Sequence, residues 1–349
     1  EFFSVRWTSE FVPEKTGDHE FVFAFDDGMR LFINDQLVVD KWENENAQGG
    51  LRSTRYRTHF KAGTSYKIRI EYVQRETLAT FYASVREPVN GVLSDPMQDA
   101  IHLAKQSDVA VLFVGLSNKI ESEGFDRIDF ALPKDQIELI QKVSRVQPNT
   151  VVVVEAGSPV EMSWKDSVAG ILYAWYPGEQ GAEALANVLL GITNPSAKLP
   201  LTMPVSLSDV PAMKNYPGKN NIENYSEGPH VGYRGIENAN YDFGFGLSYS
   251  QFSIDHIDAR TIDKSTKNPQ VTVSVNLSNY SDRDGAEVVE LFMQHPQTQD
   301  YINLKAFKKI ALAKNSSQKV SFSLDFDSFA QYNEALKAKT VYPGQYKIK

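Results

Sequence analysis

A short acidic stretch, residues 121–133, contains the side chains best suited to catalysis. It reads Glu-Ser-Glu-Gly-Phe-Asp-Arg-Ile-Asp-Phe-Ala-Leu-Pro, with four carboxylates, one arginine and one glycine. A carboxylic acid can donate and accept a proton during a reaction when its neighbours set its pKa. Charged stretches of this kind usually face water, so a solvated surface loop is the alternative.

The flanking residues predict that this stretch connects a strand to a helix. The run 109–115 is apolar and ends in glycine, which is typical of a buried parallel strand. Pro133 begins an amphipathic segment with proline in its first turn, which predicts a helix. Open α/β sheets bind their ligands at the carboxyl ends of the strands, so we expect the acidic stretch to face a ligand.

Residues 122–127, Ser-Glu-Gly-Phe-Asp-Arg, followed by Leu132-Pro133, resemble the acid/base loop of the β-glucosidases of glycoside hydrolase family 3. The resemblance implies that Glu123 is the general acid/base. Asp126 and Arg127 are candidates for binding substrate or shaping the loop, and we expect them to hold its shape by pairing rather than to touch the sugar.

The residues after the acidic loop predict the rest of an α/β domain. Buried strands are expected at 150–154 and 169–175, with helical patterns between them and at 181–190, which favours a parallel sheet covered by helices. The segments that end these strands resemble recurrent segments of the same family, as does the closing stretch 241–249. Glu155 departs from the family pattern, which has a small or amide residue there, and we interpret it as structural.

The first part of the sequence, residues 1–92, alternates like an all-β domain and resembles a protective-antigen-type β-sandwich. Such modules occur as inserts in some β-glucosidases and as sugar-binding heads in adhesins. Asp26 and Asp27 are candidate calcium ligands, because calcium prefers hard oxygen ligands. The alternative, which we favour, is that they close a hairpin with Asp-Gly in the turn. The aromatic residues Phe2, Trp42 and Tyr56 could stack on a sugar, although we expect core or interface packing.

The predicted fold class is multidomain α/β plus all-β, with three consecutive domains. The first is the β-sandwich of residues 1–92, truncated at its amino end. The second, 93–250, is a partial parallel α/β sandwich that resembles the carboxyl-terminal domain of the family. The third, 251–349, alternates strictly and resembles a fibronectin type III-like β-sandwich whose last strand we expect to be absent.

Composition excludes several classes of function. The net charge of −8 argues against a nucleic-acid partner, and no apolar run approaches the roughly 18 residues of a membrane span. The sequence has no cysteine, its six histidines lack metal-ligand spacing, and it has no nucleotide-binding motif, so we predict no metal and no cofactor. Asn-x-Ser triplets at Asn224, Asn276, Asn279 and Asn315 favour an extracellular over a cytoplasmic location.

A retaining glycosidase needs two carboxyl groups about 5–5.5 Å apart, one as nucleophile and one as acid and then base. The resemblance implies that the nucleophile is an aspartate on an amino-terminal (β/α)8 barrel, which this sequence does not match. We therefore predict part of a retaining β-glucosidase that acts on terminal β-D-glucosyl residues of β-glucosides or oligosaccharides, partnered by that barrel and nearly inactive alone. The alternatives are a non-catalytic carbohydrate-binding or adhesion protein that uses the first β-sandwich, and a purely structural module.

Overall fold

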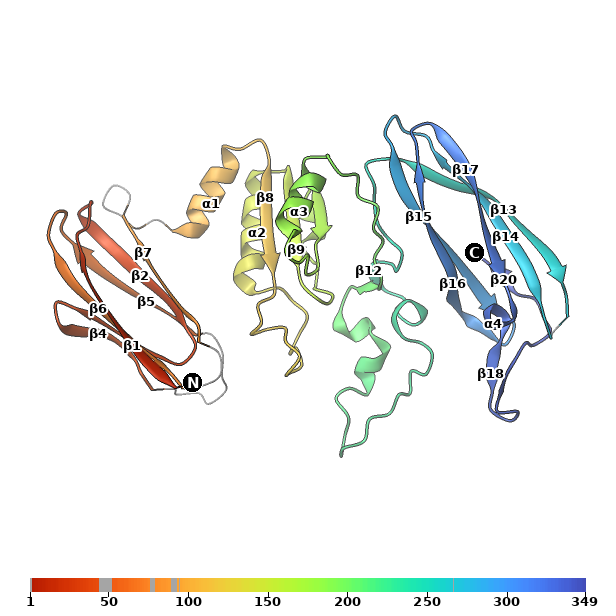
Figure 1. Ribbon diagram of the computed structural model, residues 1–349, viewed down its shortest axis with the longest axis horizontal. Helices are drawn as coiled ribbons and strands as arrows, with labels where there is room; N and C mark the ends of the chain where they lie inside the picture. Colours follow the sequence, from red (N-terminus) through yellow and green to blue (C-terminus); the bar gives the residue numbers. More distant parts are fainter. Residues whose placement is uncertain (1, 44–51, 76–78, 89–92, 94, 266) are drawn as a thin grey trace. The chain divides into compact units, whose positions relative to one another are not determined.

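The computed structural model describes residues 2–43, 52–75, 79–88, 93, 95–265 and 267–349 (Figure 1). These residues belong to two compact units. The first comprises Glu1–Arg127, Pro133–Val153 and Ser167–Ile171, and the second comprises Ile128–Leu132, Val154–Asp166 and Leu172–Lys349. None of the helices in the described ranges has the length and apolar character needed to cross a membrane.

The first unit begins with two antiparallel sheets, ordered β1-β6-β3-β4 and β5-β2-β7. Their strands are β1 (Phe3–Phe11), β2 (Gly17–Phe25), β3 (Gly28–Ile33), β4 (Gln36–Lys41), β5 (Arg52–Phe60), β6 (Tyr66–Gln74) and β7 (Phe81–Arg86). Both sheets contribute to one hydrophobic core, in which Phe23 of β2, Leu31 of β3 and Tyr72 of β6 are almost fully buried. The alternation of the sequence therefore predicted an all-β region, although β5 was not among the predicted strands.

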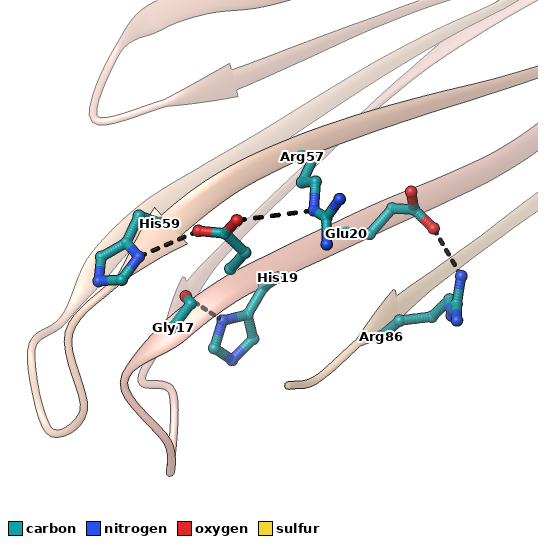
Figure 2. Close-up of polar contacts among 7 residues, drawn as sticks. Gly17, His19, Glu20, Arg57, His59 and Arg86 are labelled. Atoms are coloured by element: carbon teal, nitrogen blue, oxygen red, sulfur yellow. Dashed lines mark hydrogen bonds and ion pairs between the residues drawn. The ribbon is translucent and has the colours of Figure 1, made fainter. Parts of the chain in front are cut away.

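Strand β2 shows the alternation most clearly, because every second residue is buried. Its outward residues form ion pairs with the neighbouring strands (Figure 2). The Asp18 carboxylate lies 3.0 Å from His59 Nδ1 and 3.7 Å from Arg57 Nε, both on β5. Glu20 lies 2.9 Å from Arg86 Nη1 on β7. The outward side of β2 thus carries charged pairs at Asp18 and Glu20, and its other side lies in the core.

The connection from β2 to β3 corrects one sequence prediction. Asp26 and Asp27 do not close a hairpin, because β2 and β3 belong to different sheets. They lie instead where the chain crosses from one sheet to the other. Gly28 is required there by close approach, since a Cβ would lie 2.5 Å from the carbonyl oxygen of Trp42.

The α/β region follows the predicted order of elements with one exception: the helical pattern expected between the strands at 150–154 and 169–175 is only a three-residue 3-10 helix. It contains α1 (Pro96–Lys105), β8 (Ala110–Gly115), α2 (Lys134–Val146), β9 (Thr150–Glu155), the short 3-10 helix η1 (Lys165–Ser167), β10 (Gly170–Tyr173) and α3 (Gly181–Leu189). The sheet order is β10-β9-β8. Helices α1 and α2 pack with β8 through Ala104, Ala110 and Val143, which are all buried. The Asp95 carboxylate accepts a hydrogen bond from Met97 N and caps α1.

The second unit continues through short elements to a β-rich carboxyl-terminal region. The short elements are β11 (Met203–Pro204), η2 (Leu207–Asp209), η3 (Pro211–Lys214), η4 (Gly232–Arg234) and β12 (Ala239–Tyr241). The carboxyl-terminal elements are β13 (Phe252–Asp263), β14 (Gln270–Asn279), β15 (Gly285–His295), β16 (Thr298–Leu312), β17 (Ser316–Leu324), α4 (Phe326–Phe329), β18 (Gln331–Asn333), β19 (Ala338–Thr340) and β20 (Lys347–Ile348).

The carboxyl-terminal strands form two three-stranded sheets, β13-β14-β17 and β16-β15-β20, and a small pair, β18-β19. Leu277 of β14, Leu291 of β15 and Phe322 of β17 meet in one core. The last residues of the chain already pair as a strand, because Ile348 of β20 lies opposite Met293 of β15.

Candidate active site

The acidic loop begins where β8 ends, and its start is fastened to α2. Gly115 N donates to Gln136 Oε1 at 2.9 Å, and Gln136 Nε2 donates back to Gly115 O at 3.1 Å. Gln136 lies in the first turn of α2, so one side chain satisfies both backbone groups of the last strand residue. The strand end and the helix start are therefore held together on either side of the loop.

Glu123 occupies the tip of the loop. Glu121 N donates to Ser117 O at 3.0 Å, which closes a first turn. Ser122 and Phe125 then form an isolated antiparallel bridge, which leaves Glu123 and Gly124 between them. Glu123 and Gly124 are both exposed. A carboxyl group in this position can exchange a proton with a molecule bound against the tip of the loop.

Arg127 closes the base of the same loop. Its Nη1 lies 3.8 Å from Glu121 Oε1, and the two side chains are only 14% and 16% exposed. Asp126, which we expected to help hold the loop by pairing, is exposed. The structure thus adds Glu121 to the residues that shape the loop. The signal available in the sequence was a glutamate before the Ser-Glu-Gly turn and an arginine after it.

In the second unit, residues 128–132 are anchored independently. Glu161 N donates to Phe130 O at 2.7 Å, and Leu132 is 2% exposed. Ile128, in contrast, is 98% exposed. This segment is consequently held at its downstream end.

The two strand ends that the sequence singled out also meet within the second unit. Tyr173 Oη donates to Ser158 O at 2.6 Å. The ring of Tyr176 lies where a side chain on Gly157 would project, 2.5 Å from the position of a Cβ. Trp175, two residues after the end of β10, has a left-handed φ of 56°. Glu155, at the end of β9, is partly buried.

The carboxylates of Asp26 and Asp27 bind the protein's own backbone. Asp26 accepts hydrogen bonds from Asp27 N and Thr80 N, both at 3.0 Å, and from the hydroxyl of Tyr72. Asp27 is 3% exposed and accepts from Arg75 N. Burial, reinforced by the hydrogen bond to Asp26, raises the pKa of Tyr72. These contacts favour the structural interpretation over the calcium site.

Across the described ranges, no group of three or more histidine, aspartate or glutamate side chains is arranged to hold a metal ion. Of the aromatic candidates, Phe2 is 82% exposed and Tyr56 packs against the first core. Trp42 is partly buried and lines a cavity.

Comparisons with known proteins identify the family. Residues 35–249 match the glycosyl hydrolase family 3 C-terminal domain, and residues 287–349 match the fibronectin type III-like domain. The chain is 34% identical over 334 residues to a beta-glucosidase of Rhizobium radiobacter, covering 90% of this chain and 41% of that protein. It is 40% identical over 267 residues to thermostable beta-glucosidase B of Acetivibrio thermocellus, covering 74% of this chain and 35% of that protein.

Solved structures lead to the same family. The crystal structure of beta-glucosidase from Kluyveromyces marxianus in complex with glucose matches with a TM-score of 0.80 and 31% identity, over 99% of this chain and 42% of that one. The chain thus spans less than half the length of the relatives it matches. It belongs to glycosyl hydrolase family 3, and it contains that family's C-terminal domain and a fibronectin type III-like domain.

Proposed function

We propose that this chain is part of a retaining β-glucosidase that removes terminal β-D-glucosyl residues, and that Glu123 is the general acid/base of the enzyme. The observation that carries the proposal is the placement of Glu123, exposed at the tip of a loop that is braced at the end of β8. The names of the relatives, which are beta-glucosidases, support the choice of substrate.

In the proposed reaction the Glu123 carboxyl group acts twice. In the first step it donates its proton to the glycosidic oxygen while the bond to the anomeric carbon breaks and the aglycone leaves. In the second step the resulting carboxylate accepts a proton from the water that attacks the glycosyl-enzyme. The glucosyl group is held between these steps by a second carboxylate, which we place on an amino-terminal barrel outside this chain.

The ion pair between Arg127 and Glu121 supports this role of the loop. It ties the two sides of the loop together below the tip. Pairing also occupies Glu121, so that Glu123 is the exposed glutamate of the acidic stretch. A fixed loop matters because proton transfer requires the acid within hydrogen-bond reach of the glycosidic oxygen.

The finer division of the chain belongs to the same proposal. We assign residues 1–92 to a protective-antigen-type β-sandwich, 93–250 to the α/β domain and 251–349 to the fibronectin type III-like β-sandwich. Two antiparallel sheets around one core support the first assignment, and alternating strands and helices support the second.

An assay of the chain by itself tests the division of the two carboxylates. The chain should leave an aryl β-glucoside essentially unhydrolysed, because it lacks the nucleophile, whereas the intact protein should hydrolyse the same substrate. Release of the aryl group is followed by absorbance. Turnover by the chain alone that disappears in Glu123→Gln would mean that both carboxylates are present here, and the proposed division would be wrong.

A further inference from the structure

The first unit contains a cavity of about 530 Å³ at one end of its two sheets. Arg30 of β3, Asp40 of β4 and Arg52 of β5 line it together with Trp42. The volume lies within the range of small-molecule sites, roughly 300–1,000 Å³. The cavity is distinct from the acidic loop, since its lining residues all lie between 25 and 53.

Two nitrogens of Arg52 lack acceptors among the residues that the structure describes. Its guanidinium group lies over the ring of Phe25, with Cζ 5.0 Å from the ring centroid, and Nη1 reaches Glu43 O at 3.5 Å. Within the described residues, Nε and Nη2 are buried and have no hydrogen-bond partner. These two nitrogens form one edge of the guanidinium plane, and their N–H bonds match the two oxygens of a carboxylate or phosphate.

Unlike Arg52, Arg30 is paired with other residues that line the cavity. Its Nε donates to Asp40 Oδ1 at 3.1 Å, and its Cζ lies 4.7 Å from the centroid of the Trp42 ring. Asp40 Oδ1 also accepts from Trp42 N at 3.1 Å. The hydrogen bond from Arg30 holds the pKa of Asp40 below its ordinary value. Arg30 and Asp40 thus fix Trp42 as one wall of the cavity.

The remaining lining residues supply both donors and acceptors. Lys41, Glu43 and Ser53 are exposed at the cavity. Sugar hydroxyls donate and accept hydrogen bonds, so a mixed lining of this kind suits them. Among the described lining residues, three cations (Arg30, Lys41 and Arg52) against two carboxylates (Asp40 and Glu43) leave one positive charge.

We propose that this cavity binds a saccharide that carries an acidic group. Arg52 Nε and Nη2 take two oxygens of that group, Trp42 contacts the apolar face of the sugar ring, and Ser53 and Glu43 bind its hydroxyls. The shared chemistry is an oxyanion on a sugar, which is either a carboxylate or a phosphate. Binding needs neither a metal ion nor the catalytic carboxylates.

The test is a calorimetric titration of the whole chain, in the presence of a metal chelator, with four probes. Glucuronate and glucose 6-phosphate carry the two kinds of oxyanion, glucose lacks the charge, and acetate lacks the sugar. At least one of the charged sugars should bind about tenfold or more tightly than glucose and acetate, because a charge-assisted pair of hydrogen bonds is gained. The comparison of the two charged sugars distinguishes carboxylate from phosphate recognition.

Substitutions on one strand provide the matched controls. Arg52→Met should weaken binding of the preferred probe about tenfold or more. Arg55→Met should leave it unchanged, because Arg55 lies outside the cavity and its side chain is 65% exposed. Lys41→Met changes an exposed residue, so it keeps the test decisive if Arg52→Met does not fold. It should weaken binding of the charged sugars but not binding of glucose.

Three results would overturn the proposal: equal affinity for glucose and both charged sugars, binding that survives both Arg52→Met and Lys41→Met, or binding that disappears in the chelator. None of them bears on Glu123, because the titration involves no turnover. Failure of this site and failure of the proposed glycosidase are therefore distinguishable.

Discussion

Glu121 and Arg127 limit how far the tip of the acidic loop can move. Their side chains are largely buried, and removing one member of such a pair takes this partner from the charge of the other at a position that water reaches poorly. In the sequence, the bridge between Ser122 and Phe125 lies between the two residues of this ion pair. The ion pair should therefore stabilise the closed form of the loop.

Glu121→Gln should loosen the loop without unfolding the rest of the chain. Loss of the charged acceptor should destabilise the closed loop by about 1–2 kcal/mol, which corresponds to amide exchange that is about 5–30-fold faster. Hydrogen exchange of the peptides that cover 121–127, measured by mass spectrometry, gives the result. Glu138→Gln is the control, because it breaks an exposed pair with Lys142 on α2 and should have little effect. Equal exchange in both variants would exclude the bracing role.

The sequence alone allowed Glu123 to be proposed as the acid, but it did not identify the ion pair that supports its loop. Glu123 is singled out by a local motif between a buried strand and a proline-initiated helix, and these signals are contiguous in the chain. The partner of Arg127 depends on how the intervening residues turn, which a motif does not specify. The same is true of Asp26, since oxygen chemistry alone suits both a calcium ion and the backbone amides that it binds.

The stretch from Phe243 to Tyr249 packs closely against β15. Gly244 has a left-handed φ of 80°, and a Cβ at this position would collide with the Glu290 carboxylate. Nearby, Lys198 Nζ lies 2.7 Å from Glu287 Oε1 and donates to Gly246 O at 2.6 Å. Burial raises the pKa of Glu290. The backbone conformation thus favours glycine, and a Cβ there would also force the Glu290 carboxylate to move.

Gly244→Ala should destabilise the second unit by more than conformation alone explains. The left-handed backbone costs an alanine about 1–2 kcal/mol, and the collision with Glu290 adds to it. Gly232→Ala is the matched control, since Gly232 also has a positive φ, 54°, but open space around it. Urea denaturation measures the loss of unfolding free energy in each variant. Adding Glu290→Ala to Gly244→Ala should restore part of the loss that Gly244→Ala causes. Losses of equal size would show that contact with β15 is unimportant.

His295, at the end of β15, is buried as a neutral imidazole. Its Nδ1 accepts from Gln297 N and its Nε2 donates to Phe329 O, both at 3.2 Å. The side chain is 3% exposed. Burial lowers its pKa below the ordinary 6.5, and the charge of Lys305 acts in the same direction. Protonation would remove the acceptor that Gln297 uses.

The carboxyl-terminal region should accordingly lose stability in mild acid. Above about pH 6.5 neither the folded nor the unfolded state binds a proton at His295. Below it the unfolded chain takes up a proton that the folded chain does not, so stability falls by at most about 1.4 kcal/mol per pH unit until the lowered pKa is reached. Thermal melting across this range should show a weaker pH dependence in His295→Gln than in the unsubstituted chain. His256→Asn replaces an exposed histidine and should keep the pH dependence of the unsubstituted chain. If the melting temperature changed equally with pH in all three proteins, His295 would be ruled out as the cause.

The elements were predicted best where their signals are local. Pro133 and Gly181 mark helix starts that the structure reproduces within a residue or so. Connections between sheets were predicted poorly. Asp-Gly indicates a turn, but whether the next strand joins the same sheet depends on the hydrophobic faces of both strands, and β3 buries Met29 and Leu31 in the shared core.

At the scale of the whole molecule, the proposal divides the catalytic pair between Glu123 in this chain and a second carboxylate outside it. It covers 41% of the Rhizobium radiobacter relative and 42% of the Kluyveromyces marxianus structure. Patterns of hydrophobicity and charge predicted an acidic loop at a strand end. Only the resemblance to a family indicated which reaction the loop would take part in. The account therefore depends on the claim that Glu123 donates a proton to the leaving group.

Comparing leaving groups in the intact protein tests this claim most directly. A poor leaving group such as an alkoxide needs the proton, whereas an activated aryl leaving group does not. Glu123→Ala should lower kcat/KM for an alkyl β-glucoside by about 10²–10⁴-fold and change the value for a dinitrophenyl β-glucoside far less. Asp126→Ala, the neighbouring exposed carboxylate, should affect both substrates alike. Equal losses on both substrates in Glu123→Ala would contradict its assignment as the acid.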